Sequence, residues 1–370
     1  MEENSRIFAT ETKKGEMRPT VCWDFTFLNR YDMMTDKNIL ITGASGFIGS
    51  FLVEGALERG FETWAGIRPT SKTNYIADER IHHLALTFSC AQTFREQLAM
   101  QKQRHGRFDY IVHCAGVTKC KDKSEFDQVN YGQTRLFIET LQELDMMPKQ
   151  FIFISTLSVF GPIHEQTYEP IKENDSPQPN TAYGKSKLKA EQYLQSLPGL
   201  PYVIFRPTGV YGPREKDYFL MAKSIKNHID TAVGYRRQDL TFVYVKDIVQ
   251  AVFLAIEKAV VRRSYFLSDG QVYPSRAFSD LIQKELGISW VLHLKFPLWV
   301  LKAISFVAEK CAKAKGTTST LNSDKYNIMK QRNWQCDIAP VREELGYIPQ
   351  YDLERGVRET IAWYKQEKWL

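Results

Sequence analysis

Tyr183 and Lys187 stand four residues apart, a spacing that places both side chains on one face of a helix. A tyrosine can exchange a proton with an alcohol or a ketone if a nearby cation lowers its pKa from the usual value of about 10. Thr156 comes earlier, directly after the apolar run Phe151–Ser155, which is typical of a strand. An α/β sheet places its ligand-binding groups at such strand ends. The pair therefore predicts acid–base chemistry that accompanies hydride transfer.

Tyrosine followed by lysine at the fourth position is not specific by itself, because the pattern occurs four times. Within residues 168–172, Pro170 would break the helix that has to align such a pair. The pairs that begin at Tyr326 and Tyr364 lie far toward the C-terminus, with no preceding sheet strand to supply a partner. We therefore favour the pair that opens a helix after Thr156 and expect the other three to be surface pairs.

A glycine-rich segment lies between the first expected strand and the first expected helix, at residues 42–49. Its first glycine permits a tight turn, the second lets the backbone approach a pyrophosphate, and the third lets helix and strand pack closely. The N–H groups of the helix N-terminus would then face the phosphates. The segment predicts dinucleotide binding by Gly43, Ser45, Gly46, Phe47, Ile48 and Gly49.

The end of the second expected strand bears on the choice of dinucleotide. An acidic residue there would bind the ribose hydroxyls and favour NAD. The chain instead has Arg68 at this point, and an arginine can stack on adenine and pair with a 2′-phosphate. We therefore favour NADP as the cofactor, with NAD as the alternative.

Strands alternate with helices through the first half of the chain, which predicts an α/β fold: a Rossmann-type, doubly wound parallel sheet. The expected strands are 38–42, 62–67, 110–113, 151–155 and 202–206, and the expected helices are 47–59, 126–144 and one that begins near Tyr183. Later helices are expected near 247–259, 275–286, 297–313 and 353–367.

Three regions follow from this pattern. Residues 1–36 are expected to form an irregular N-terminal extension, or alternatively a docking arm that uses its aromatic residues. Residues 37–206 are expected to form the dinucleotide-binding core. Residues 207–370 are expected to form a smaller substrate-binding lobe, with strands and helices that return to the core.

Composition excludes several classes of protein. The chain has 370 residues, of which 43% are hydrophobic and 25% charged, as in an ordinary soluble enzyme. A net charge of +6 is too small to indicate nucleic-acid binding. The six cysteines lack paired spacing, so we expect neither a disulfide scaffold nor a metal site, and reduced thiols favour a cytoplasmic location. No apolar run approaches the ~20 residues that cross a bilayer, and no signal peptide is expected.

Several further segments, in the same order, resemble the extended short-chain dehydrogenase/reductase superfamily, also called the NAD-dependent epimerase/dehydratase family. The resemblance runs from about Asn38 to the end of the chain. The matching segments are 42–49 (T-G-x-x-G-x-x-G), 113–116, 130–134 (N-x-x-G-T), 155–161 (S-(S/T)-x-x-V-(Y/F)-G), 183–187 (Y-G-x-S-K), 206–213 (R-P-x-x-V-Y-G-P) and 242–247 (F-V-x-V-x-D).

The resemblance implies roles for particular residues. Tyr183 would exchange the substrate proton, Lys187 would lower the pKa of Tyr183 and bind the nicotinamide ribose, and Thr156 would position the substrate oxygen. The resemblance also implies further residues that contact the cofactor and a set of residues that contact the substrate. The implied cofactor contacts are Tyr183, Lys187, Ala115, Gly116 and Pro207, and the implied substrate contacts are Thr118, Thr156, Ser158 and Gly209.

Two classes of substrate remain open. Nucleotide-sugar members of the family usually have an asparagine where this chain has Gly209, and the glycine resembles the 3β-hydroxysteroid dehydrogenase branch. We therefore expect an oxidoreductase of an apolar, steroid-like alcohol or ketone. The alternative is a nucleotide-sugar epimerase, dehydratase or reductase. A third interpretation, a cofactor-sensing protein without turnover, is disfavoured by the intact tyrosine, lysine and threonine.

Two surfaces are candidates for larger partners. Residues 296–315 combine a bulky apolar run with Lys302, Lys310, Lys313 and Lys315, which suggests peripheral contact with a membrane or a cap over an apolar pocket. A blander interpretation is a core-facing helix with a solvated lysine face. Many relatives form homodimers through two long helices, here 126–144 and 183–197.

Overall fold

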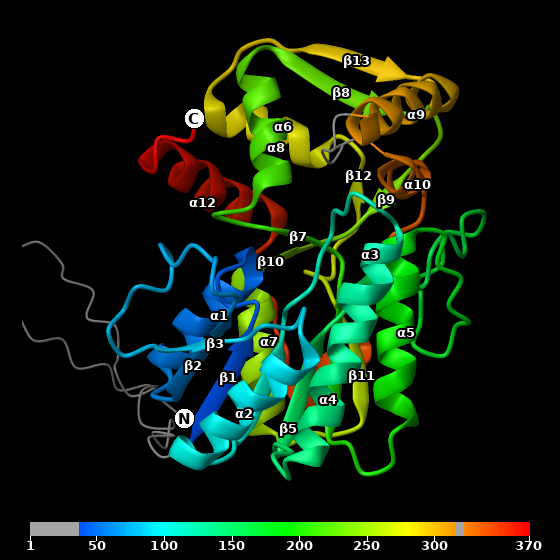
Figure 1. Ribbon diagram of the computed structural model, residues 1–370. Helices are drawn as coiled ribbons and strands as arrows, with labels where there is room; N and C mark the ends of the chain where they lie inside the picture. The colour runs from blue at the N-terminus through cyan, green and yellow to red at the C-terminus, as the bar shows by residue number, and fades with distance from the viewer. Residues whose placement is uncertain (1–36, 315–321) are drawn as a thin grey trace, which may run out of the picture.

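The computed structural model describes residues 37–314 and 322–370, with no account of the side chains of 311–314. A parallel sheet carries helices on both faces, and a smaller lobe lies over one end of it (Figure 1). The expected α/β fold is therefore confirmed. The predicted extension at residues 1–36 lies outside the described residues.

The sheet contains seven strands, joined by parallel pairings throughout. They are β1 (Asn38–Thr42), β2 (Glu62–Ile67), β3 (His82–Ala85), β4 (Tyr110–His113), β5 (Gln150–Ile154), β6 (Tyr202–Pro207) and β11 (Arg263–Leu267). Their order is β11-β6-β5-β4-β1-β2-β3. The central strands are continuous apolar runs because both of their faces are buried.

Alternate residues of β1 enter different hydrophobic clusters, one on each face of the sheet. Ile39 and Ile41 pack with α1 (Phe47–Glu58), α7 (Val245–Glu257) and α11 (Ala339–Leu345). Leu40 packs in the cluster of the opposite face. The helices of that face are α2 (Ala91–His105), α4 (Gln133–Glu143) and α5 (Ala182–Ser196).

The lobe is built from segments that follow β6. One cluster joins α6 (Lys216–Lys226), α8 (Ala277–Leu286) and α12 (Leu353–Gln366) to the paired strands β7 (Gly209–Tyr211) and β10 (Phe242–Tyr244). Two further strand pairs are β8 (Ile229–Val233) with β13 (Leu292–Phe296), and β9 (Asp239–Leu240) with β12 (Tyr273–Pro274). The helices α9 (Leu298–Ala314) and α10 (Ser323–Lys330) lie beside them (Figure 1).

Two expectations about the elements need correction. The helix expected over 126–144 is not uniform: α3 (Ser124–Phe126) leads into a π-helical segment, Asp127–Gly132, before α4 begins. The strand β11 belongs to the main sheet and pairs with β6, although it was not anticipated because its first residues are polar. In residues 37–314 and 322–370, no helix has both the length and the apolar character needed to span a bilayer.

Candidate functional site

The turn between β1 and α1 forms a glycine cradle, the segment 43–49. Gly43 has a φ of +68°, and its carbonyl accepts a hydrogen bond from the Gly46 N–H at 2.9 Å. A Cβ on Gly49 would lie 2.2 Å from that same carbonyl oxygen. Gly46 is the N-cap of α1, and no side chain caps the first N–H groups of the helix. The exposed helix N-terminus and the close turn fit a pyrophosphate.

A buried histidine fixes this cradle to the neighbouring strand. His113 lies between the hydroxyls of Thr42 at 2.8 Å and Thr134 at 3.0 Å. Burial lowers its pKa to about 3, so the ring is neutral and each nitrogen has one hydroxyl partner. The Thr42 hydroxyl also accepts from the Ala115 N–H at 3.3 Å. This network, which sequence reasoning missed, holds the segment after β4 against Gly43.

Asn130 links that segment to α5. Its side chain accepts from the Val117 N–H at 2.8 Å and donates to the Ser186 hydroxyl at 3.0 Å. A Cβ on Gly116 would lie 2.9 Å from the Asn130 oxygen and 3.6 Å from Lys187 Nζ. The predicted residue Gly116 therefore passes close to the Lys187 ammonium, and the absence of a side chain at Gly116 leaves the space beside that ammonium open.

Lys187 is buried at the carboxyl end of β5. Its Nζ donates to the Ile154 carbonyl at 2.8 Å and lies 4.3 Å from the centre of the Phe153 ring. Burial lowers the pKa of this ammonium to about 8. The Ile154 carbonyl accepts a hydrogen bond from one of the three N–H groups of the ammonium, so other N–H groups remain that could donate to a ribose hydroxyl.

Tyr183 lies on the same helix, and its phenol interacts with the Thr156 side chain. Burial raises the pKa of Tyr183 to about 12, and the hydrogen-bonding interaction with Thr156 acts in the opposite direction. The Thr156 hydroxyl in turn bonds Ser158, with 3.2 Å between the oxygens. The structure thus brings the predicted tyrosine, lysine and threonine together at the ends of β5 and α5.

The other three tyrosine–lysine pairs lie elsewhere. Tyr168 donates to the Arg237 carbonyl at 2.9 Å. Tyr326 lies on α10, where the Lys330 Nζ approaches its ring. Tyr364 is fully buried and donates to the Glu215 carbonyl at 2.6 Å, so the expectation of a surface pair is wrong there. Its ring fills the lobe core on α12.

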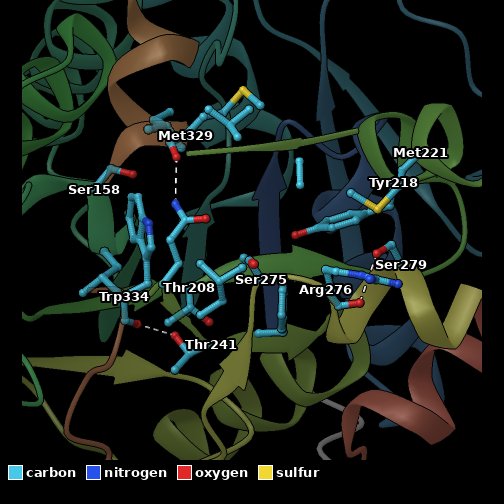
Figure 2. Close-up of a pocket in the computed structure, with 18 of the residues that line it drawn as sticks. Ser158, Thr208, Tyr218, Met221, Thr241, Ser275, Arg276, Ser279, Met329 and Trp334 are labelled. Carbon is cyan, nitrogen blue, oxygen red and sulfur yellow. Dashed lines mark hydrogen bonds between the residues drawn. The ribbon is translucent and has the colours of Figure 1, made fainter. Parts of the chain in front are cut away.

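A cavity of about 330 Å³ begins at Thr156 and extends into the lobe. Figure 2 shows Trp334 and Met329 on one side, facing Tyr218 and Met221 on the other. The predicted residues Ser158, Pro207 and Gly209 also line it. Thr118 does not line this cavity: it is exposed on the segment after β4. Arg68 is exposed directly after β2, where its backbone N–H donates to the Ser71 hydroxyl at 3.2 Å.

Several polar groups of the cavity were not predicted. Within the described residues, the buried Thr208 hydroxyl has no hydrogen-bond partner, which marks a polar contact point for a ligand. At the lobe end, Asp230 accepts from the Ser279 hydroxyl at 3.1 Å and contacts His293 at 3.0 Å. The Arg276 guanidinium lies 3.0 Å from the other nitrogen of His293. No local motif signals this cluster.

Gly209 makes room for an aromatic side chain. A Cβ at this position would lie 2.9 Å from the Tyr218 hydroxyl and 3.1 Å from the Phe242 ring. The Tyr218 ring stacks on Phe278, with centroids 4.3 Å apart. The Tyr218 hydroxyl therefore occupies the space that a side chain at position 209 would need, and both residues line the cavity.

Residues 39–267 match the NAD dependent epimerase/dehydratase family. The UDP-glucose 4-epimerase of Vibrio cholerae is 27% identical over 365 residues, covering 90% of this chain and 98% of that protein. The dTDP-glucose 4,6-dehydratase of Neisseria gonorrhoeae is 24% identical over 363 residues, covering 90% and 96%. Neither relative is a steroid dehydrogenase, so the comparison favours the expected family without its steroid branch.

Solved structures agree with the fold. The UDP-glucose 4-epimerase of Thermotoga maritima with UDP-glucose superimposes with a TM-score of 0.72 at 20% identity, covering 90% of this chain and 99% of that one. The dTDP-glucose 4,6-dehydratase of Bacillus anthracis in complex with NAD gives 0.70 at 18% identity, with 90% and 98% covered. The family match spans the whole sheet from β1 to β11. The chain therefore belongs to the NAD dependent epimerase/dehydratase family and is an enzyme of that type.

Proposed function

We propose that the enzyme acts on a nucleotide sugar, by a reaction of the epimerase or dehydratase type that begins with hydride removal from a sugar carbon bearing a hydroxyl. One observation carries the proposal: the cavity starts at Thr156, whose side chain interacts with the Tyr183 phenol, and continues to polar groups in the lobe. Relatives that align over nearly their whole length are named as enzymes of nucleotide sugars.

The acid–base roles go to three residues. Tyr183 accepts the proton of the substrate hydroxyl, and Thr156, which interacts with its phenol, orients the same oxygen. We assign to Lys187, one helical turn from Tyr183, the positive charge that makes the phenolate accessible, because burial raises the pKa of the tyrosine to about 12. The ammonium is fixed by the Ile154 carbonyl, so its charge needs no rearrangement during the reaction.

The dinucleotide is assigned to the groups around the cradle. When bound, it supplies the hydride acceptor. Gly43, Ser45, Gly46 and the first N–H groups of α1 would hold the pyrophosphate, and Lys187 would bind the nicotinamide ribose. Ala115, Gly116 and Pro207 complete this proposed set, together with Phe47, Ile48, Gly49 and Tyr183.

We keep NADP as the proposed form of the cofactor, on the evidence of the exposed Arg68 after β2. The family description and the NAD complex of a structural relative favour the alternative, NAD. Dissociation constants for NADP⁺ and NAD⁺, measured for the wild type and for Arg68→Asp, decide between them. A wild type that prefers NAD⁺, with a preference unchanged by the substitution, contradicts the role of Arg68.

The cavity offers complementary groups for the two ends of a nucleotide sugar. Ser158 and Thr156 face the sugar end, whereas Arg276, whose guanidinium also pairs with Asp280 at 2.7 Å, is a cation at the lobe end for a diphosphate. The Trp334 and Tyr218 rings provide flat apolar surfaces for a base or a sugar face (Figure 2).

An apolar alcohol or ketone is the second candidate. Gly209 with its associated Tyr218, and the lining residues Met221, Met329 and Trp334, favour it. This interpretation keeps the same acid–base residues and changes only what fills the lobe end of the cavity.

A thermal-shift panel with cofactor plus UDP-sugars, dTDP-sugars or sterols tests the proposal. We expect a clear shift with one class of nucleotide sugar and none with sterols. Thr208→Val and Arg276→Ala should reduce that shift, whereas the exposed Arg358→Ala, on α12, should not. A shift with sterols alone would replace the proposal with the second candidate.

A further inference from the structure

We propose that the outer face of α9 docks the lobe on an anionic membrane surface. The docking face consists of Trp299, Ala303, Phe306 and Val307, with lysines at its border. This inference concerns where the enzyme works and does not depend on the substrate assigned above.

Most apolar side chains of α9 are exposed, and Trp299, Ala303 and Phe306 also line a hollow that α9 forms with α10. Of residues 298–310, whose side chains the structure describes, only Leu301 and Ser305 are buried, and they lie one turn apart on the inner face. Trp299 is 73% exposed, Phe306 59% and Val307 58%. One expectation from the sequence was a helix with its apolar face toward the core and its lysines in solvent. The structure instead places much of the apolar face outward.

Helical spacing gathers these residues into one stripe. Positions 299, 303, 306 and 307 lie on the side of the helix opposite Leu301 and Ser305, because 303 and 306 follow 299 by four and seven residues and 307 follows 303 by four. A contiguous apolar face of this kind marks an interaction site rather than ordinary surface. The 17-residue helix is about 25 Å long, so it can lie along an interface but does not cross one.

The charges at the border select an anionic partner. Lys302 and Lys310 flank the stripe, Lys295 is exposed on the adjoining strand, and the Lys310 Nζ lies 4.6 Å from the Phe306 ring centre. The acidic residue Glu309 is turned toward α10, where it accepts from the Ser323 N–H at 3.0 Å. Long lysine side chains with apolar neighbours suit phospholipid headgroups, since the stems bury while the ammonium groups stay in water.

A second copy of this chain fits the face less well. A twofold pairing of α9 would bring the lysines of one helix near those of the other, and like charges at short range oppose association. Anionic headgroups instead attract each lysine by about 1 kcal/mol, or roughly fivefold in affinity.

The fold leaves the catalytic region accessible in this arrangement. The strand β13 and helix α9 lie at the end of the lobe that is farthest from α1 and β1 (Figure 1). The cavity is lined by Thr231, Ala232 and Val233 of β8, the strand that pairs with β13. Docking through α9 would therefore hold the lobe near the bilayer with the glycine cradle in water.

Vesicle sedimentation tests the proposal on the full chain. We expect the protein to sediment with vesicles of phosphatidylcholine and phosphatidylglycerol, to sediment less with phosphatidylcholine alone, and to dissociate as salt is added. Trp299→Ser with Phe306→Ser should weaken binding by about tenfold or more, and Lys302→Ala with Lys310→Ala by roughly 25-fold. Ile348→Ser is the matched control, because Ile348 is 66% exposed and lies outside α9.

Thermal unfolding of each variant establishes that it is folded. Sedimentation that does not differ between the vesicle types, or that survives both pairs of substitutions, overturns the proposal. So does a wild type that ignores vesicles but elutes as a dimer that Trp299→Ser and Phe306→Ser convert to a monomer, since the face would then join two copies.

Discussion

The Asp324 carboxylate accepts a hydrogen bond from the backbone N–H of Tyr183 at 3.3 Å. The same oxygen accepts from the Ala182 N–H at 2.8 Å. Asp324 is buried, on α10 of the lobe, whereas Tyr183 opens α5 of the core. A carboxylate at this end of a helix is favourable because it pairs with free N–H groups and with the positive end of the helix dipole. The lobe therefore holds the helix that presents Tyr183 and Lys187.

Asp324→Ala should lower both stability and turnover. Loss of the carboxylate leaves two N–H groups of α5 without this acceptor, which should cost about 1–2 kcal/mol of unfolding free energy. Because these N–H groups belong to the turn that carries Tyr183, we expect the turnover number to fall by about tenfold while the affinity for the cofactor changes little. Denaturant unfolding and steady-state kinetics measure the two effects.

Asp352→Ala provides the matched control for that prediction. Asp352 is the N-cap of α12 and accepts from the Arg355 N–H of its own helix at 2.8 Å, but it lies away from Tyr183. We expect a similar loss of unfolding free energy with nearly normal turnover. Equal losses of activity in the two variants would show that Asp324 acts through general stability alone.

Tyr183→Phe should fold and bind cofactor, yet lose about 10²- to 10⁴-fold in turnover, because the proton acceptor is removed while the ring remains. The ring packs edge-on against Phe126, with centroids 6.1 Å apart, and the substitution preserves that contact. Steady-state kinetics with the substrate found in the ligand panel measure the loss. Tyr326→Phe removes the hydroxyl of another tyrosine–lysine pair and should leave turnover unchanged; near-normal turnover in Tyr183→Phe would contradict the assignment.

The parts that could be predicted from sequence are those determined by neighbours in the chain. The expected bounds of β1, β2 and β4 match the structure because each is an apolar run limited by turn residues. The cradle is likewise local, because the Gly46 N–H donates to the Gly43 carbonyl and Gly49 packs against that same carbonyl. Tyr183 and Thr156 could be singled out because each lies at a recognisable element end.

The parts that could not be predicted depend on contacts between distant segments. Asp324 lies 141 residues from Tyr183, and nothing in the intervening sequence indicates that they meet. Tyr218 and Trp334 enter the cavity wall only after the lobe has folded over the sheet. The outward face of α9 was also hidden, because amphipathic spacing shows that a helix has an apolar side and not which way that side points.

Lys187 predicts a stability that depends on pH. Its pKa is about 8 in the folded protein against a usual 10.5, so between these values the unfolded chain binds more protons and stability rises with pH. Lys187→Met should lack this rise. From about pH 7 to about pH 9.5, the free energy of unfolding should therefore increase by about 2 kcal/mol more in the wild type than in the variant. Denaturant titrations without cofactor measure it.

The exposed Lys185, on the same helix, gives the control for this measurement. Lys185→Met should keep the pH dependence of the wild type. Tyr183 acts in the opposite sense at higher pH, since its pKa is raised from 10.0 to about 12 and stability falls between those values. If the free energy of unfolding changes with pH by the same amount in the wild type and in Lys187→Met, the lowered pKa of the buried lysine is contradicted.

Two glycines in different parts of the core should respond oppositely to alanine. A Cβ on Gly49 would lie 2.2 Å from the Gly43 carbonyl, which is backbone and cannot move without opening the turn, so Gly49→Ala should destabilise the protein by roughly 2–4 kcal/mol and abolish dinucleotide binding. At Gly132 the nearest atom would be 3.7 Å away, an ordinary contact, so Gly132→Ala should be neutral or stabilise by up to about 1 kcal/mol. Thermal unfolding and fluorescence titration with the reduced cofactor compare the variants. Normal cofactor affinity in Gly49→Ala would mean that the phosphates are held elsewhere, because the cradle could not retain its shape around the added methyl group.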